Sequence, residues 1–320
     1  HRVDRRQRQM CIRDRTKMYS IGIYMDQIDG LDFKKDSTVS IMRHLQSKAK
    51  VKLIIPDSIS YNNGHIYGDI SDIEITSLNK GKYIAKKKRK TNLNKLDCIF
   101  FRRDPPVNSK YISQLQILRE LQYQNTLVLN SPESLLQLNE KFLGNQLSQN
   151  KIPSIISSNN KQIENFLVSH GTIVLKPLNL MAGEGIIKLT MSKNSKKEIK
   201  NHIDKYGIII AQKYLVEVMN GDNRIIIYNG IIEKNVLTRY PPKGDFIANL
   251  ARGGKYKINV IKKKHLNHLK SVASYLRYHG IFFAGIDMIG DYITEVNITS
   301  PTGVQQIKSG LSLRIAKELI

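Results

Sequence analysis

Two carboxylates and one amide near the C-terminal end have the residue types of a cation site. Asp287, Glu295 and Asn297 stand in the otherwise apolar stretch IFFAGIDMIGDYITEVNIT. Mg²⁺ prefers hard oxygen ligands of this kind and shares its coordination shell with substrate phosphates. The alternative is an exposed polar face of a sheet, but polar groups in so apolar a stretch need compensation. We therefore favour a metal site.

Whether these three side chains meet depends on the hairpin that strands 281–289 and 292–298 would form. Residues two apart on one strand share a face, so the second carboxylate and the amide lie together. A three-residue turn at 290–292 would pair Asp287 with Glu295 and add Asp287 to that face. A two-residue turn would point Asp287 away, so a metal site predicts the longer turn.

Two lysines and a glycine-bearing turn could contact phosphate, although each also has an ordinary explanation. Lys176 ends a predicted strand and is held extended by the proline that follows it. Beyond it, Gly183 and Gly185 could bring backbone N–H groups up to an anion, but two glycines are more often a plain turn. Lys141 lies inside a predicted helix, where an ordinary surface lysine is the simpler interpretation.

Arginines stand at two further positions of interest. Asp222 and Arg224 are two residues apart at the start of a predicted strand, and they could equally be a surface ion pair worth less than about 1 kcal/mol. Arg102 follows the predicted strand 96–101. Ligands of open α/β sheets bind beyond the carboxyl ends of such strands, so Arg102 is a candidate for substrate binding.

The elements that must position these residues alternate between strands and helices. In a first unit, 18–130, apolar runs predict strands at 20–25, 51–55, 96–101 and 126–129 and helices at 37–46 and around 112–121. This alternation is typical of a parallel α/β sheet.

A second unit, 131–213, joins a linker helix to a small lid. One helix is predicted to begin at Ser131, with proline at its first position, and to continue through Leu143. The strands and helices that follow it make only a small unit with a glycine-bearing turn, which is typical of a lid domain.

The third unit, 214–320, carries the predicted metal site. It opens with a hairpin around Asn229-Gly230, the strongest short hairpin signal. A loop rich in Gly, Pro and Arg is predicted at 239–257, followed by a helix at 265–279 and the strand pair that holds the carboxylates.

The charge balance of this 320-residue chain first suggests a polyanionic partner. Lys and Arg number 51 against 27 Asp and Glu, a formal net charge of +24. Residues 1–17 contain seven Lys or Arg and two Asp, and residues 80–90 contain seven Lys or Arg and no acid, so these segments hold half of the net charge. We interpret 1–17 as a basic leader outside the fold and 80–90 as a solvated loop. Since only Tyr83 could stack on bases there, we expect no nucleic-acid partner.

Composition also argues against other classes of protein. No apolar run approaches the roughly 20 residues that cross a bilayer, so we expect a soluble protein without a membrane partner. The two cysteines and eight histidines show neither a disulfide framework nor metal-ligand spacing. A reducing cytoplasm fits this composition.

Taken together, these segments resemble the bacterial glutathione synthetases of the ATP-grasp superfamily. The matching motifs run in order between residues 19 and 303: IGIYMDQID, FFRRDPP, NSPESLLQLNEK, VLKPLN, GDNRIIIYNG, NLARGG and FAGIDMIGDYITEVNITSPTG. The resemblance implies an α/β ATP-grasp fold with an N-terminal Rossmann-like (pre-ATP-grasp) domain, a small lid domain and a C-terminal mixed α+β domain.

The resemblance also implies a role for each candidate residue. ATP would be bound by Lys141, Lys176, Gly183, Gly185 and Asp222 and by the hinge residues Gln212, Lys213, Tyr214 and Leu215. Lys176, Arg224 and Arg239 would act on the transferring phosphate, and Asp287, Glu295 and Asn297 would hold Mg²⁺ or Mn²⁺. Substrate would be held by Arg224, by the closing loop with Asn249, Arg252, Gly253 and Gly254, and by Arg102, Ser300 and Thr302.

One loop departs from the family pattern. The family commonly has D-G-M-G-G after Lys-Pro-Leu, whereas this chain has N-L-M-A-G-E-G at 179–185. A glutamate facing phosphate would be unfavourable, so we expect Glu184 to point away from ATP.

The activity that the resemblance implies is ATP-dependent ligation. γ-Glutamylcysteine and glycine would be joined through an acyl phosphate to give glutathione, ADP and phosphate, with no nucleophilic side chain. By family analogy the enzyme would be a cytoplasmic homotetramer. Two alternatives stay open: another ATP-grasp carboxylate-amine ligase with different substrates and, from another class, a nucleic-acid-binding protein that uses residues 80–90.

Overall fold

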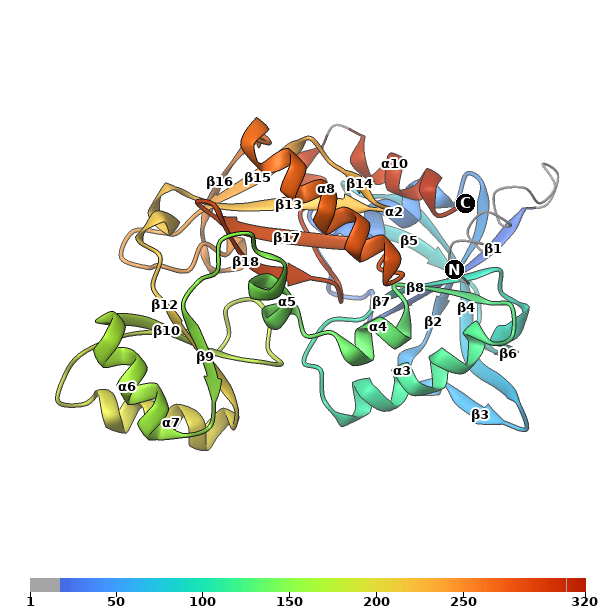
Figure 1. Ribbon diagram of the computed structural model, residues 1–320. Helices are drawn as coiled ribbons and strands as arrows, with labels where there is room; N and C mark the ends of the chain where they lie inside the picture. Colours follow the sequence, from blue (N-terminus) through green and yellow to red (C-terminus); the bar gives the residue numbers. More distant parts are fainter. Residues whose placement is uncertain (1–17, 309) are drawn as a thin grey trace.

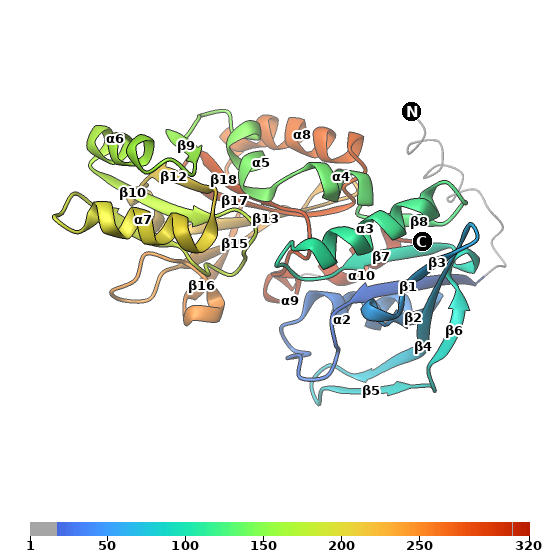
Figure 2. The same ribbon diagram turned by 90° about the horizontal axis from the view of Figure 1, so that it is seen from below.

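Three β-sheets organise the part of the chain that the computed structural model describes, residues 18–308 and 310–320. The predicted leader at 1–17 lies outside the described residues. In Figures 1 and 2 the lid lies at one end of the molecule and the N-terminal sheet at the other, with the C-terminal sheet between them. None of the described helices has both the length and the apolar composition needed to cross a membrane.

The N-terminal sheet has the parallel centre that the alternating pattern predicts. Its order is β3-β4-β2-β1-β7-β8, and β2, β1, β7 and β8 run parallel. Helices α2 (Ser37–Leu45) and α3 (Ser109–Gln122) pack into different cores on opposite faces, because Ile23 of β1 points to one core and Tyr24 to the other. The strands are β1 (Tyr19–Met25), β2 (Ala49–Ile54), β3 (Ser60–Asn62), β4 (His65–Ser77), β5 (Lys82–Ala85), β6 (Arg89–Asn92), β7 (Cys98–Arg102) and β8 (Leu127–Leu129).

The basic segment 80–90 is not the loop that we expected. It contains β5 and β6, which both pair with the long antiparallel strand β4. Its side chains are exposed except that of Tyr83, which is half-buried. Because nearly all of these side chains meet water, the segment needs no apolar alternation and carries no strand signal in the sequence.

The predicted helix from Ser131 is two helices. Helix α4 (Pro132–Gln137) ends before Leu138, whose backbone is extended, and α5 (Glu140–Leu147) begins anew. Asn139 caps α5, since its side chain accepts hydrogen bonds from the backbone N–H groups of Lys141 at 3.1 Å and Phe142 at 3.4 Å. The break rotates the second half of the segment, which leaves Phe142 exposed and Lys141 buried.

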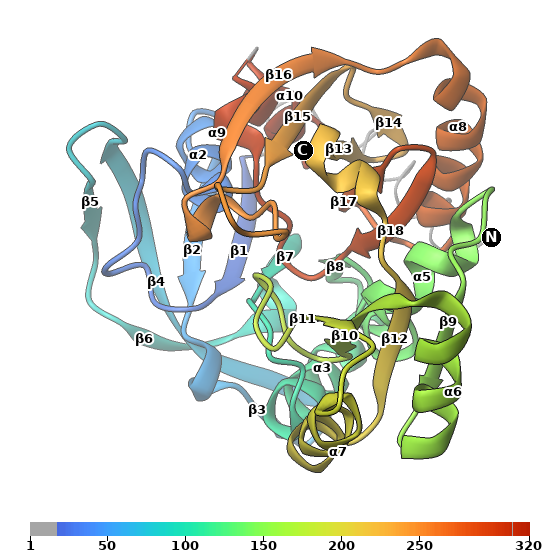
Figure 3. The same ribbon diagram turned by 90° about the vertical axis from the view of Figure 1, so that its left-hand side faces the viewer.

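The lid is a four-stranded antiparallel sheet of order β11-β10-β12-β9 with two helices. Its elements are β9 (Ser154–Ser157), α6 (Asn160–His170), β10 (Thr172–Pro177), β11 (Ile187–Thr190), α7 (Ser195–Tyr206) and β12 (Ile209–Lys213). They form the small unit of strands and helices that the sequence predicts after the linker helix. Helices α6 and α7 lie on the side of this sheet that is turned away from the C-terminal sheet (Figures 1 and 3). The other face of the lid sheet is therefore turned toward the C-terminal sheet.

The C-terminal sheet has the order β16-β15-β13-β17-β18, with β14 paired to β13. Its elements are β13 (Asp222–Tyr228), β14 (Ile231–Ile232), β15 (Asn235–Tyr240), β16 (Lys255–Val260), α8 (Lys263–Tyr278), β17 (Phe283–Ile289) and β18 (Tyr292–Asn297). The predicted loop at 239–257 is wrong at its end, because β16 begins there. Every residue of this edge strand is exposed, so it has no buried face to reveal it.

The hairpin of β17 and β18 pairs Asp287 with Glu295, as a metal site requires, but not through the predicted three-residue turn. Ile289 pairs with Tyr292, so the turn has two residues. A β-bulge then inserts Thr294 between the two pairing registers and restores the 287–295 pair. The expected turn was wrong, and a bulge supplies the extra residue instead.

The last two helices, α9 (Val304–Ile307) and α10 (Leu311–Glu318), return to the N-terminal sheet, where Leu311 and Ile315 pack in one core with Ile41 of α2. Both large hydrophobic cores combine residues of the N-terminal and C-terminal sheets. The lid has a separate core. The N-terminal and C-terminal sheets are thus joined by shared packing, and the lid stands apart.

Candidate functional site

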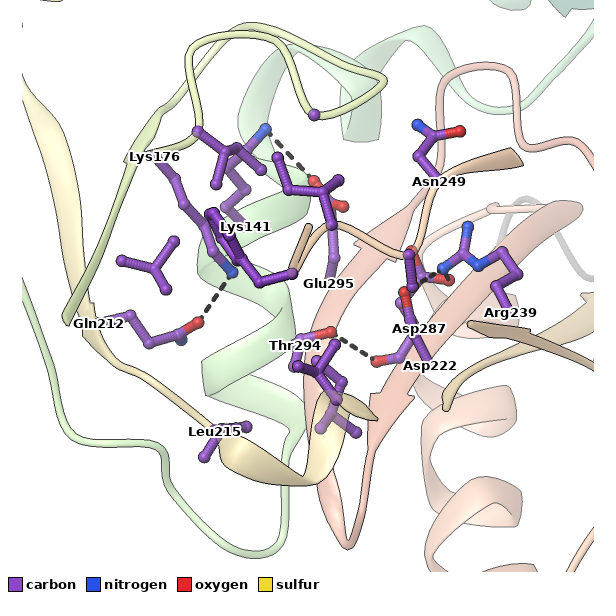
Figure 4. A pocket seen from close by; sticks show the side chains of 18 of the residues that line it. Lys141, Lys176, Gln212, Leu215, Asp222, Arg239, Asn249, Asp287, Thr294 and Glu295 are labelled. Carbon is purple, nitrogen blue, oxygen red and sulfur yellow. Dashed lines mark hydrogen bonds and ion pairs between the residues drawn. The ribbon is translucent and has the colours of Figure 1, made fainter. Parts of the chain in front are cut away.

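A cleft opens between the lid sheet and the C-terminal sheet (Figure 4). Its walls come from β10, β12, the loop after β10, the first turn of α5, the C-terminal sheet and the segment before η4 (Leu250–Arg252). The predicted site residues that line it are Lys141, Lys176, Gly183, Gln212, Lys213, Tyr214, Leu215, Asp222, Arg224, Arg239, Asn249, Asp287, Glu295 and Asn297. Residues from the second and third predicted units therefore meet in one place.

Lys141 is buried at the cleft floor, contrary to the simple interpretation as a surface lysine. Its Nζ donates to the backbone oxygen of Leu180 at 2.7 Å and contacts Glu295 Oε1 at 3.2 Å. Leu178 O lies 3.4 Å away. The first turn of α5 thus aims one cation at both the lid loop and β18.

Lys176 lies at the end of β10 and points into the cleft from the lid. Its Nζ donates to Gln212 Oε1 on the neighbouring strand β12 at 2.8 Å. Burial lowers the pKa of Lys176, while the Glu295 carboxylate acts in the opposite direction. A neutral amide is thus the hydrogen-bond partner of a buried charge, which leaves the lysine able to bind an anion.

Across the cleft, two arginines and two aspartates form a buried network. Arg224 is paired with Asp287 in the sheet register, and its guanidinium binds both carboxylate oxygens, at 2.6 and 2.7 Å. Arg239 Nη2 contacts Asp222 Oδ2 at 2.5 Å and Asp287 Oδ1 at 3.0 Å. Strand pairing places all four side chains together, since Asp222 is paired with Arg239.

The two aspartates of this network differ in pKa. Burial would raise the pKa of Asp287, but the charges of Arg224 and Arg239 outweigh it and lower the pKa to about 2. For Asp222, burial has the largest effect and raises the pKa to about 6. The Arg239 charge lowers this pKa and the Asp287 carboxylate raises it further. Asp222 Oδ1 and Arg239 Nε are buried without a hydrogen-bond partner among the described residues, so the network can still accept a ligand.

The predicted metal ligands share one face of the β17–β18 hairpin. Asn297 Nδ2 donates to Asp287 Oδ2 at 3.0 Å and to Gly285 O at 3.2 Å, so its amide oxygen is the atom turned toward other partners. Within the described residues, no group of three or more His, Cys, Asp or Glu is placed to hold a metal. The donor set of two carboxylates and one amide oxygen fits a hard cation, with Asp287 already bonded to arginines.

The lid loop after β10 reaches the cleft at Gly183 but not at Gly185. Gly183 has φ +79°, and a Cβ there would lie 2.9 Å from Ile247 Cγ2, so this loop touches the segment before η4. Gly185 (φ +67°) packs instead against Pro177 and Tyr206, which leaves no room for a side chain. Glu184 is exposed but lies on the cleft lining, so the structure does not turn it fully away.

The hinge residues form the end of the cleft between β12 and η3 (Val216–Asn220). The Tyr214 ring lies 3.9 Å from Lys188 Nζ and 6.1 Å, edge to face, from the Phe246 ring. Apolar residues that the sequence reasoning missed line this region: Val174, Leu180, Met181, Ile186, Val218, Phe246, Ile247, Ala248 and Ile289. They resemble ordinary core residues, so nothing in their sequence context could have singled them out.

Seven of the predicted residues do not line the cleft: Arg102, Gly185, Arg252, Gly253, Gly254, Ser300 and Thr302. Arg252 Nε contacts Asp245 Oδ2 at 3.2 Å near the surface. Gly253 and Gly254 form the turn that closes on Asn249, since Gly254 N donates to Asn249 O at 3.2 Å. Thr302 contributes its backbone oxygen, which lies 3.4 Å from Arg224 Nη1.

Among these residues, Arg102 ends strand β7 of the N-terminal sheet. It is buried, and it donates to Thr38 Oγ1 at 3.0 Å and to Pro301 O at 2.8 Å. Ser300 bonds Asp104 in the same area. Arg102 Nη1 is buried without a hydrogen-bond partner in the described part of the chain, which makes it a candidate for binding an anionic group.

Two family models match the chain over almost all of its length. The prokaryotic glutathione synthetase N-terminal domain matches residues 19–135, and the prokaryotic glutathione synthetase ATP-grasp domain matches residues 140–311. The chain belongs to the prokaryotic glutathione synthetase family. Membership confirms the resemblance and makes the chain an ATP-dependent ligase of glutathione biosynthesis.

Individual relatives of this glutathione synthetase family cover the whole fold. The glutathione synthetase of Wigglesworthia glossinidia brevipalpis is 34% identical over 95% of this chain and 96% of its own length. That of Buchnera aphidicola subsp. Baizongia pistaciae is 33% identical over 93% of each.

Solved structures support the ATP-grasp fold. The D-cycloserine synthetase DcsG aligns over 94% of this chain and 98% of its own, with a TM-score of 0.65 and 10% identity. The ATP-grasp ligase PsnB, in a complex with a minimal precursor, aligns over 95% and 99%, with a TM-score of 0.61 and 13% identity. At these identities the likeness concerns the fold alone, and the expected fold class is confirmed.

Proposed function

We propose that the chain joins γ-glutamylcysteine to glycine at the expense of ATP. The observation that carries the proposal is the cleft itself, where the buried Lys141 and the half-buried Lys176 face carboxylates and an arginine pair across one space. Family membership supports the same reaction. Another ATP-grasp carboxylate-amine ligase would share these residues and differ only in its substrates.

The reaction begins with activation of a carboxylate, which is too poor an electrophile for direct attack by an amine. A carboxylate oxygen of the dipeptide attacks the γ-phosphorus of ATP, and ADP leaves. The amine of glycine then attacks the acyl carbon and loses a proton, and phosphate leaves. Lys141 and Lys176 would neutralise the ATP phosphates, and Arg224 and Arg239 would stabilise the phosphoryl group during transfer.

Glu295 and Asn297, with Asp287, would hold the Mg²⁺ or Mn²⁺ ion. A divalent cation there would neutralise charge on the phosphate oxygens. Glu295 is more open than Asp287, with side chains 27% and 6% exposed. Asp287 would share in binding while it keeps its contacts with the arginines.

The remaining residues would bind the nucleotide base and the substrates. The hinge from Gln212 to Leu215 would receive adenine, and Asn249 would lie on the loop that covers the substrate. Arg102 would hold a carboxylate of the dipeptide through its unpaired Nη1. The roles proposed for Gly185, Asp222, Arg252, Gly253, Gly254, Ser300 and Thr302, the cytoplasmic location and the homotetramer stay predictions.

The decisive experiment measures ADP release by the purified chain with Mg²⁺, with each substrate added or withheld. We expect turnover only with both γ-glutamylcysteine and glycine, and glutathione in amounts equal to ADP. Glu295→Gln should abolish turnover while dipeptide binding persists, because the substitution removes a metal ligand. ADP release that ignores both substrates would refute the proposal, and turnover with a different amine would identify the alternative ligase.

A further inference from the structure

Helix α5 covers the outer edge of β18, which is the last strand of the C-terminal sheet. An edge strand leaves a row of backbone N–H and C=O groups without a neighbouring strand. Three residues at four-residue spacing contact β18 or the two residues that follow it: Glu140 and Gly144 of α5, and Ser148, which directly follows the helix. Each of the three contacts a different part of this segment.

Gly144 and Ser148 hold the first half of the strand. The Ile293 N–H donates to Ser148 Oγ at 2.9 Å. A Cβ on Gly144 would lie 2.7 Å from the carbonyl carbon and oxygen of Thr294, so the helix sits directly on the backbone of the bulge. Since these neighbours are backbone atoms, even one methyl group would have to push helix and strand apart.

Glu140 holds the end of the strand. Its Oε1 accepts three hydrogen bonds, from Ile298 N at 2.7 Å, Thr299 N at 2.9 Å and Thr299 Oγ1 at 2.9 Å. Within the described residues, Glu140 has no ion pair with a lysine or arginine. Burial, and then the nearby Glu295 carboxylate, raise the pKa of Glu140. Because burying a carboxylate without a cationic partner is unfavourable, we expect Glu140 to hold the backbone of residues 298 and 299 in place.

The two elements that this contact joins carry opposite halves of the cleft. Lys141 follows Glu140 directly on α5. Glu295 and Asn297 lie on β18 between Thr294, which contacts Gly144, and the end of the strand. The 3.2 Å contact between Lys141 and Glu295 spans the same gap. A shift of α5 along β18 would therefore change the distance from the phosphate-binding lysine to the metal ligands.

We propose that Glu140, with Gly144 and Ser148, is a positioning residue that fixes the metal ligands of β18 relative to Lys141. This inference rests on the proposed function, because it assigns Glu140, Gly144 and Ser148 to the same ATP and metal site. Side chains that orient metal ligands from behind typically matter about 10- to 100-fold for metal affinity or activity when they are lost. None of the three is expected to touch ATP or substrate.

The first test compares Glu140→Ala with Glu140→Gln. Glutamine keeps an oxygen that can accept the same three hydrogen bonds, whereas alanine keeps none. Binding of Mn²⁺, followed by electron paramagnetic resonance in the presence of ADP, should weaken about 10- to 100-fold in Glu140→Ala and stay near wild type in Glu140→Gln. The kcat should follow the same order. Glu133→Ala, which removes a carboxylate whose side-chain partner among the described residues is Gln137 on α4, should behave as wild type.

The second test, Gly144→Ala, does not depend on the Glu140 variants folding. Alanine favours the helix by about 1 kcal/mol over glycine, so any loss must come from the contact with β18. Because the methyl group must displace backbone atoms of β18, we expect a somewhat lower Tm, and weaker Mn²⁺ binding and a lower kcat of the protein that is still folded, while Gln146→Ala on the exposed side of α5 changes none of these.

The outcomes separate the two proposals. Wild-type Mn²⁺ affinity and kcat in a folded Glu140→Ala or Gly144→Ala protein would overturn the positioning role alone. So would losses of activity that only follow a lower Tm, with unchanged Mn²⁺ affinity of the folded fraction. A wild-type chain that neither binds Mn²⁺ nor turns over would overturn the proposed function and, with it, this role.

Discussion

The two sides of the cleft hold their cations in different ways. On one side, Lys141 and Lys176 bond mainly to neutral oxygens, those of Leu180 and Gln212, with a single carboxylate contact at 3.2 Å. On the other side, Arg224 and Arg239 are locked to Asp287 and Asp222. The lysine side uses acceptors that phosphate oxygens can replace, and the arginine side uses full charges in bidentate geometry.

This difference separates the part of the site that can exchange partners from the part that is built in advance. A buried lysine with a neutral partner gains when an anion arrives, because the anion supplies the missing opposite charge. A doubly paired arginine gains little and keeps its position. We therefore expect the lysine side to determine nucleotide affinity and the arginine side to determine the integrity of the C-terminal sheet.

Breaking the arginine side should have the largest effect. Asp287→Asn leaves Arg224 and Arg239 without their shared countercharge, so the free energy of unfolding should fall by about 3–5 kcal/mol and turnover should be lost. Urea unfolding and ADP release measure the two effects. Asp245→Asn is the control, since its partner Arg252 is about half exposed and the pair should contribute less than about 1 kcal/mol. Equal stability of the two variants would contradict the comparison.

Breaking the lysine side should reduce binding rather than stability. Lys176→Met removes a half-buried charge whose side-chain hydrogen-bond partner, among the described residues, is the neutral amide of Gln212, so unfolding in urea should be unchanged or slightly harder. The KM for ATP should rise about 10- to 100-fold, the worth of one or two charge-assisted hydrogen bonds. Lys193→Met, at an exposed position of the lid, should leave both quantities unchanged. A marked loss of stability in Lys176→Met would show that this side too is structural.

The smallest expected effect is a pH dependence that belongs to the lysine side alone. Because burial lowers the pKa of Lys176, it loses its proton at a lower pH than an exposed lysine, and the KM for ATP should rise as the pH increases through that range. In the same range this group makes folding more favourable with increasing pH, since the unfolded chain still binds the proton. Lys176→Arg should move the rise in KM to higher pH, and an unmoved profile would assign it to another group.

The shared face of Glu295 and Asn297 could be predicted from spacing because strands have a two-residue period. The bulge at Thr294 could not, since it lies against Gly144, about 150 residues earlier in the chain, and strand periodicity does not register such a tertiary contact. The parallel centre of the N-terminal sheet was predictable from its apolar runs. Strands β5, β6 and β16 were not, because exposed edge strands have no buried face.

The chemical residues show the same limit. Lys141 has no distinguishing feature in the sequence, and its burial depends on the helix break that Asn139 caps. The resemblance to a family identified it where periodicity could not. Glu140 was overlooked even with the resemblance, because its partners are backbone groups more than 150 residues away and no motif records them.

The shared packing of the first and last sheets has a consequence for synthesis on the ribosome. Asn130 donates to the carbonyl oxygens of Phe283 at 2.8 Å and Ile298 at 2.6 Å, and Phe283 and Ile315 complete a core that begins at Ile21. A nascent chain that has emerged only to the lid therefore exposes apolar surface that nothing yet made can cover. The lid, with its own core, can fold during translation. The N-terminal sheet can complete its core only after nearly the whole chain has been synthesised.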